Sequence, residues 1–168
     1  LEPYDIKVDL EAWIYGPGIP LDMPEVSSDR FEKVDELITR YADGAPFDTG
    51  VTNAWTTHEW LHFIRHLPED MAVAKLRSLD DQFALAGSGN AEIAAAWYEV
   101  AIRRGYADEI KEEIVTFLTR VGRRKFLMPI YRAMKESGMA ETARDIYQTA
   151  RPNYHAVSTQ SIDKLLEM

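Results

Sequence analysis

The sequence has 168 residues, of which 46% are hydrophobic, so it is long enough to form one domain with a sizeable core. Its formal net charge is -9, from 28 acidic and 19 basic residues, which argues against general binding to nucleic acids or to anionic membranes. Because the chain contains no cysteine, disulfides, thiol catalysis and thiolate metal sites are excluded.

The first 26 residues form a lead-in that is rich in proline and glycine. The segment from Gly16 to Pro20 can neither continue a helix nor pair as a central strand. We therefore expect an extended connector over residues 1–26. Residues 27–168 are expected to form a separate helical domain.

From residue 29 onward, apolar residues recur at steps of three and four, which predicts a series of amphipathic helices. The first helix begins at a capping pair of Asp29 and Glu32. The second begins at a capping box of Thr56 and Glu59, and a third helix is predicted over residues 68–83.

The second half of the chain continues this pattern. Asn90 is a good N-cap for a helix over residues 91–104, and Asp108 caps a run that ends at Gly122. Pro129 is expected in the first turn of the next helix, which ends at Gly138. Two last helices are predicted over residues 140–151 and 158–167.

These roughly eight helices, with no convincing strand between them, predict an all-α fold. Short connections between helices favour antiparallel neighbours. We therefore expect helix pairs stacked in two layers, an alpha-alpha superhelix like those of armadillo and HEAT arrays.

The first candidate for chemistry is the segment from His58 to His62, which matches a zinc-site pattern. In that pattern, two histidines one helical turn apart bind zinc and the glutamate between them, here Glu59, activates water. However, Glu59 follows Thr56 by three residues and is explained by helix capping. The third zinc ligand would have to be Asp81, which is shorter than the glutamate expected there. We interpret the match as chance, with no metal at His58, Glu59 or His62.

The second candidate is a cationic cluster around Gly122, made of Arg120, Arg123, Arg124 and Lys125, where one predicted helix ends and another begins. Arg123 and Lys125 stand two apart in what we expect to be a non-helical turn. Their guanidinium and ammonium groups could converge on one anionic group, such as a carboxylate. The alternative is a solvated cluster that pairs with nearby acidic residues and with a helix C-terminus.

The segment from Gly122 to Phe126 resembles the Gly-Arg-x-Lys-Phe segment of one family of helical domains. This family comprises the C-terminal domains of leukotriene A-4 hydrolase, aminopeptidase B and related bacterial aminopeptidases. The segment from Leu10 to Pro20 resembles its connector between the catalytic and helical domains, and residues 90–97 resemble its middle helix. Residues 155–157 resemble its His-Pro-Val, with alanine in place of proline.

The resemblance implies a role in peptide hydrolysis. Arg123 and Lys125 would hold the carboxylate end of a short peptide in the substrate cleft of a catalytic domain on the same polypeptide. The zinc ligands and the catalytic residues of such enzymes lie upstream of the connector. The chain itself is therefore expected to be catalytically inert and to hold no cofactor, whereas the longer protein is expected to be a zinc-dependent aminopeptidase.

Several alternatives remain open from the sequence. One is a free-standing helical-repeat module that binds a protein on its concave face. The sequence also leaves open whether the longer protein hydrolyses epoxides, its side-chain preference and its oligomeric state. No apolar stretch predicts a membrane span, and the opening at Leu1 shows no signal peptide, so a cytoplasmic part of a longer protein is expected. A periplasmic or secreted protein is the alternative.

Overall fold

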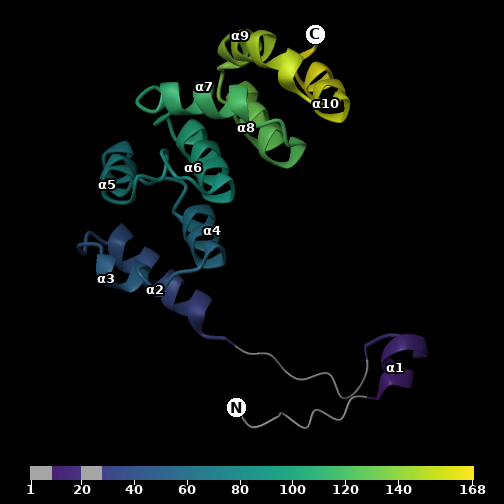
Figure 1. The fold of residues 1–168 in the computed structure, drawn as a ribbon. Helices are drawn as coiled ribbons and strands as arrows, with labels where there is room; N and C mark the ends of the chain where they lie inside the picture. Colours follow the sequence, from purple (N-terminus) through teal and green to yellow (C-terminus); the bar gives the residue numbers. More distant parts are fainter. Residues whose placement is uncertain (1–8, 20–27) are drawn as a thin grey trace.

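The computed structural model describes residues 9–19 and 28–168 (Figure 1). Within these ranges the chain has no strand and forms ten α-helices, eight of them with at least seven residues. The helices are α1 (Leu10–Tyr15), α2 (Arg30–Ala42), α3 (Thr49–Thr52), α4 (Thr57–His66), α5 (Val73–Phe83), α6 (Ala91–Arg103), α7 (Lys111–Arg120), α8 (Arg124–Glu136), α9 (Ala140–Ala150) and α10 (Ala156–Leu166).

The helices from α2 onward are stacked in layers. In one layer, α2 packs on α4, α4 on α6, α6 on α8, and α8 on α10. In the other, α7 packs on α9, and Figure 1 shows α5 on the same side of the stack. The predicted all-α fold with two layers of helices is confirmed.

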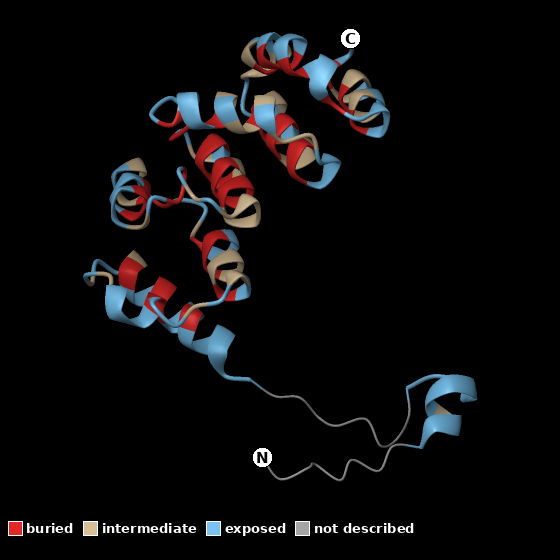
Figure 2. Cartoon of the chain, viewed as in Figure 1, coloured by how far each residue is buried: buried red, intermediate tan, exposed pale blue. Residues whose placement is uncertain are grey.

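One continuous core runs through this stack. The buried residues, red in Figure 2, lie where the helices face one another. Its largest fully buried members are Trp97 of α6, Tyr131 of α8 and Tyr147 of α9. The core therefore joins helices from both layers and fixes the ends of α7 and α8, where the cationic cluster lies.

The helix caps predicted from the sequence are confirmed in part. Thr56 and Asn90 are the N-cap residues of α4 and α6, and the Asn90 side chain accepts a hydrogen bond from the Glu92 backbone N–H (3.0 Å). Asp29 occupies the N-cap position of α2 but caps no backbone N–H, because its carboxylate instead pairs with Lys33 at 2.6 Å. The predicted capping pair at this helix is therefore wrong.

Apart from α8, which is described with the cationic cluster, three predicted helix starts differ from the structure. Helix α5 begins at Val73 rather than at residue 68, because Pro68 belongs to a turn that precedes it. Helix α7 begins at Lys111, after a turn that contains Asp108. Helix α10 begins two residues early, since His155 acts as its N-cap. Each shift reflects local turn geometry that apolar periodicity does not report.

Part of the lead-in is helical. The Asp9 carboxylate accepts hydrogen bonds from the first backbone N–H groups of α1, which has no buried residue (Figure 2). Residues 1–8 and 20–27 lie outside the described residues, and so does the predicted boundary near residue 26. No helix in the described part of the chain is long and apolar enough to cross a bilayer.

Candidate functional site

The cationic cluster lies at the junction between α7 and α8, where only three residues separate the two helices. Arg123 is the N-cap residue of α8 and has an extended backbone (φ -78°, ψ 117°). Lys125 lies in the first turn of α8. The expectation that Arg123 and Lys125 share a non-helical turn is therefore wrong for Lys125.

Helix α8 begins earlier than expected because its apolar stripe extends upstream of Pro129. Phe126, Ile130 and Ala133 are buried at steps of four and three, so a helix that starts at Arg124 buries them together. Pro129 consequently lies inside the helix. Its nitrogen carries no hydrogen and cannot donate to the carbonyl of Lys125.

The structure divides the cationic cluster into three parts. Arg123 and Lys125 both lie over the ring of Phe126, with the guanidinium carbon 5.8 Å and the ammonium nitrogen 5.0 Å from its centroid. Arg124 instead donates from Nε to the Ser161 hydroxyl of α10 (2.8 Å). Arg120 lines a separate surface pocket of about 520 Å³ between α6 and α7. Only Arg123 and Lys125 are thus brought together.

The two cations at Phe126 differ in their partners. The exposed Arg123 guanidinium has no hydrogen bond or ion pair with any residue in the described ranges, and its contact is with the ring. Lys125 forms an ion pair with Glu92 of α6, and their side chains are 50% and 33% exposed. Arg123 is therefore available to an anionic ligand, whereas Lys125 already has a carboxylate partner.

The N-terminus of α8 adds to the positive charge of this site. The first turn contains no acidic residue, and no side chain caps its backbone N–H groups. The positive end of the helix dipole and its first unpaired N–H groups therefore lie beside Arg123, Arg124 and Lys125. A cluster of cations at this end of a helix is unfavourable in isolation and becomes favourable when an anion binds there.

Two residues that the sequence analysis missed hold the junction in place. The Ser158 hydroxyl of α10 donates to the Gly122 carbonyl (3.0 Å), and the Tyr154 hydroxyl donates to the Leu118 carbonyl. Burial raises the pKa of Tyr154 to about 12, so its hydroxyl stays protonated and can donate. The signal that could have found them was the resemblance of residues 155–157 to the family's His-Pro-Val segment.

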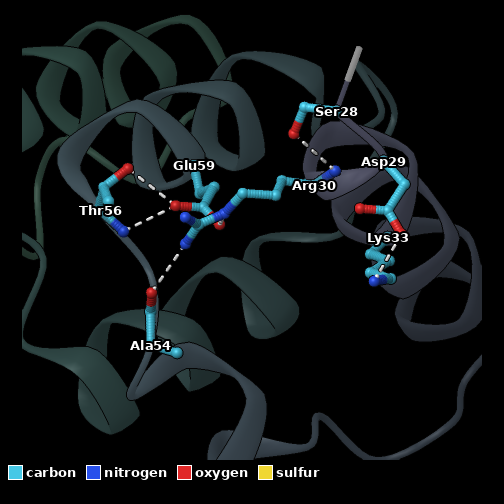
Figure 3. A network of polar contacts seen from close by, with 7 residues as sticks. All are labelled: Ser28, Asp29, Arg30, Lys33, Ala54, Thr56 and Glu59. Carbon is cyan, nitrogen blue, oxygen red and sulfur yellow. Dashed lines mark hydrogen bonds and ion pairs between the residues drawn. The ribbon is translucent and has the colours of Figure 1, made fainter. Parts of the chain in front are cut away.

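At the start of α4, Glu59 is held by a network of polar contacts (Figure 3). One carboxylate oxygen accepts hydrogen bonds from the Thr56 backbone N–H and hydroxyl (2.7 Å each), and the other accepts one from Arg30 Nε of α2 (2.6 Å). Arg30 also donates to the Ala54 carbonyl (3.0 Å). Burial acts to raise the Glu59 pKa, but the bonds from Thr56 and Arg30 outweigh it and lower the pKa below its ordinary value.

The histidines of the α4 motif lie apart from this network. His62 Nε2 donates to an Asp35 carboxylate oxygen (2.7 Å), and its ring stacks on Phe31 and His66. His58 is exposed. Within residues 9–19 and 28–168, no three His, Asp or Glu side chains are grouped so that they could hold a metal ion. That His58, Glu59 and His62 bind no zinc stays a prediction.

The fold and the junction define a layered helical domain that presents a cationic site at a helix start. The family described as "Leukotriene A4 hydrolase, C-terminal" matches residues 55–166, so the chain belongs to this family. The resemblance stated from the sequence is therefore confirmed.

Curated relatives share this domain at low identity. The chain is 27% identical to leucine aminopeptidase 2 of Neurospora crassa, over 94% of this chain and 24% of that protein. It is 25% identical to leucine aminopeptidase 2-1 of Scheffersomyces stipitis, over 96% of this chain and 28% of that protein. It is 21% identical to aminopeptidase B of Mus musculus, over 94% of this chain and 26% of that protein. The chain thus spans about a quarter of the length of these relatives, which are named as aminopeptidases.

Proposed function

We propose that this chain is the non-catalytic helical domain of a zinc aminopeptidase, in which it forms one wall of the substrate cleft. In this proposal, Arg123, assisted by Lys125, binds the C-terminal carboxylate of a short peptide. The observation that carries the proposal is the state of Arg123. Its guanidinium is exposed at the positive end of α8 and has no carboxylate partner among the described residues.

The chemistry of these groups suits a carboxylate. A guanidinium offers a planar pair of N–H donors that matches the two carboxylate oxygens, whereas an ammonium supplies charge without a fixed direction. Unpaired N–H groups at the start of α8 would add further donors. A peptide held at its C-terminus has its scissile bond aligned with the catalytic centre, so the contact contributes to orientation as well as affinity.

The remainder of the enzyme would supply the chemistry. Because the chain spans about a quarter of the curated relatives, a catalytic domain with the zinc ligands is expected in the rest of the polypeptide. Leu10, Ile14, Tyr15 and Ile19 in and after α1 are 65–80% exposed, which fits a surface that another domain covers. The chain alone is expected to have no peptidase activity.

Replacing Arg123 in the full-length enzyme tests this proposal. Arg123→Ala should lower kcat/KM for a tripeptide with a free carboxylate. The loss of transition-state stabilisation should be about 1.5 to 3 kcal/mol, the range for a charge-assisted hydrogen bond. Lys125→Ala should have a smaller effect, since Glu92 already pairs with the ammonium. Arg124→Ala is the matched control, because its guanidinium bonds to Ser161.

The same tripeptide with a C-terminal amide separates binding from structure. Because the amide presents no carboxylate, Arg123→Ala should change its hydrolysis much less. Equal losses on both substrates, with the fold intact, would mean that Arg123 supports the interface between domains. The carboxylate-binding role would then have to be withdrawn.

A further inference from the structure

Glu92 lies beside the proposed carboxylate site on a different helix. Its carboxylate pairs with the Lys125 ammonium across α6 and α8. Its backbone N–H is held by the Asn90 side chain (3.0 Å), and the Asn90 amide nitrogen in turn donates to the Thr57 hydroxyl of α4 (2.9 Å). The position of Glu92 is therefore fixed by the cap of α6 and by the neighbouring helix.

Because of this ion pair, only one of the two cations has its positive charge offset by a carboxylate. Arg123 keeps its full charge, whereas the charge of Lys125 is offset by Glu92. Arg123 and Lys125 at the Phe126 ring, together with Glu92 paired to Lys125, carry a net charge of one, which matches a single carboxylate. A ligand with two carboxylates would have to compete with Glu92 for Lys125. Its second carboxylate would also be repelled by the negative charge of Glu92.

From this geometry we infer that Glu92 is a specificity-determining residue, which limits the charge of the site so that it favours peptides with one C-terminal carboxylate over peptides whose last residue is acidic. The inference rests on the proposed binding of the peptide carboxylate by Arg123. Glu92 acts by position and charge, as a repulsive element against the wrong ligand, and takes no part in the chemistry.

The structure indicates how the discrimination arises. A C-terminal Asp or Glu carries a second carboxylate close to the first, and Lys125 is a second cation at the Phe126 ring. One oxygen of Glu92 already accepts from that ammonium. A second anion there would bring two carboxylates to one ammonium, whereas an uncharged last residue avoids this repulsion.

A matched pair of tripeptides, Ala-Ala-Glu and Ala-Ala-Gln, tests this inference in the full-length enzyme. The ratio of kcat/KM for the two peptides is measured in the parent enzyme and in the Glu92→Gln variant. The parent should prefer Ala-Ala-Gln, and Glu92→Gln should reduce that preference by about fivefold, the effect of one charge interaction at a solvated surface. This change in the ratio should come from a change in KM for Ala-Ala-Glu. The kcat for the tripeptide with a C-terminal amide should stay unchanged.

Two further variants serve as controls. Glu92→Asp keeps the negative charge and should keep the preference. Glu136→Gln removes a carboxylate that pairs with Arg103 (2.7 Å), an ion pair between α6 and α8 that lies outside the Phe126 site, and should leave the ratio unchanged.

Other results would overturn the inference. If Glu92→Gln left the ratio unchanged or raised KM equally for both peptides, Glu92 would only hold Lys125 in place. Arg123→Ala distinguishes this failure from failure of the proposed function. A loss confined to free-carboxylate peptides would leave the carboxylate site standing without a selective role for Glu92. An equal loss on the amide would remove both proposals.

Discussion

The start of α4 and the junction between α7 and α8 both carry residues whose pattern suggests chemistry. At α4, Glu59 is only 4% exposed, and its carboxylate accepts hydrogen bonds from Thr56 and Arg30. At the junction, the Arg123 guanidinium is exposed and has no hydrogen-bond partner within the described ranges. A buried charge needs such partners to be stable, whereas an exposed, unpaired charge can bind a ligand. Hydrogen bonding, rather than motif similarity, distinguishes the two regions.

The largest expected effect on stability is at α4. Glu59→Ala should lower the free energy of unfolding by about 2 kcal/mol, because it removes three hydrogen bonds and leaves Arg30 without its carboxylate partner. Arg123→Ala should change it by less than about 0.5 kcal/mol, as expected for an exposed side chain without hydrogen-bond or ion-pair partners. Urea denaturation of both variants measures the difference.

Smaller changes at the same helix start sharpen this comparison. Thr56→Ala should cost about 1 kcal/mol, the usual loss for an N-cap residue. The capping box alone would make Glu59→Gln milder than Thr56→Ala, but the ion pair with Arg30 reverses that order. If Arg123→Ala proved as destabilising as Glu59→Ala, the junction would be a structural element and the contrast between the regions would fail.

Acid should weaken the α4 region. Since the folded-state pKa of Glu59 lies below the ordinary value of 4.5, the folded chain binds fewer protons than the unfolded chain. The stabilisation from Glu59 is therefore complete above pH 4.5 and is lost as the pH falls through the folded-state pKa. Denaturation at a series of pH values should show a shallower acid loss in Glu59→Gln than in the parent chain. Parallel curves would contradict this assignment.

The smallest expected effect is that of zinc. Added zinc should leave the melting temperature unchanged, because Glu59 is held by Thr56 and Arg30 and His62 is bonded to Asp35. Elemental analysis after dialysis provides an independent measurement. One zinc per chain, lost when His58 and His62 are replaced together, would show that the motif is a metal site.

Several features of the fold could be predicted from short segments of sequence. Thr56 and Asn90 were identified as N-caps because the groups that they bond lie two or three residues away. Proline is common in the first turn of a helix, so Pro129 was expected there and the start of α8 was misplaced. In the structure, the burial of Phe126 decides where this helix begins. The start of α8 was therefore missed because packing, rather than a local signal, decides it.

The candidate site shows the same division. The sequence by itself determined the helical class, the family and the segment that contains Arg123 and Lys125, because these depend on periodicity and on a short motif. Only the tertiary structure decided that Lys125 pairs with Glu92, that Glu59 pairs with Arg30, and that Arg123 is left without such a partner. These ion pairs join residues about 30 positions apart on different helices. They form only when neighbouring helices of one layer pack against each other, so neither spacing nor composition encodes them.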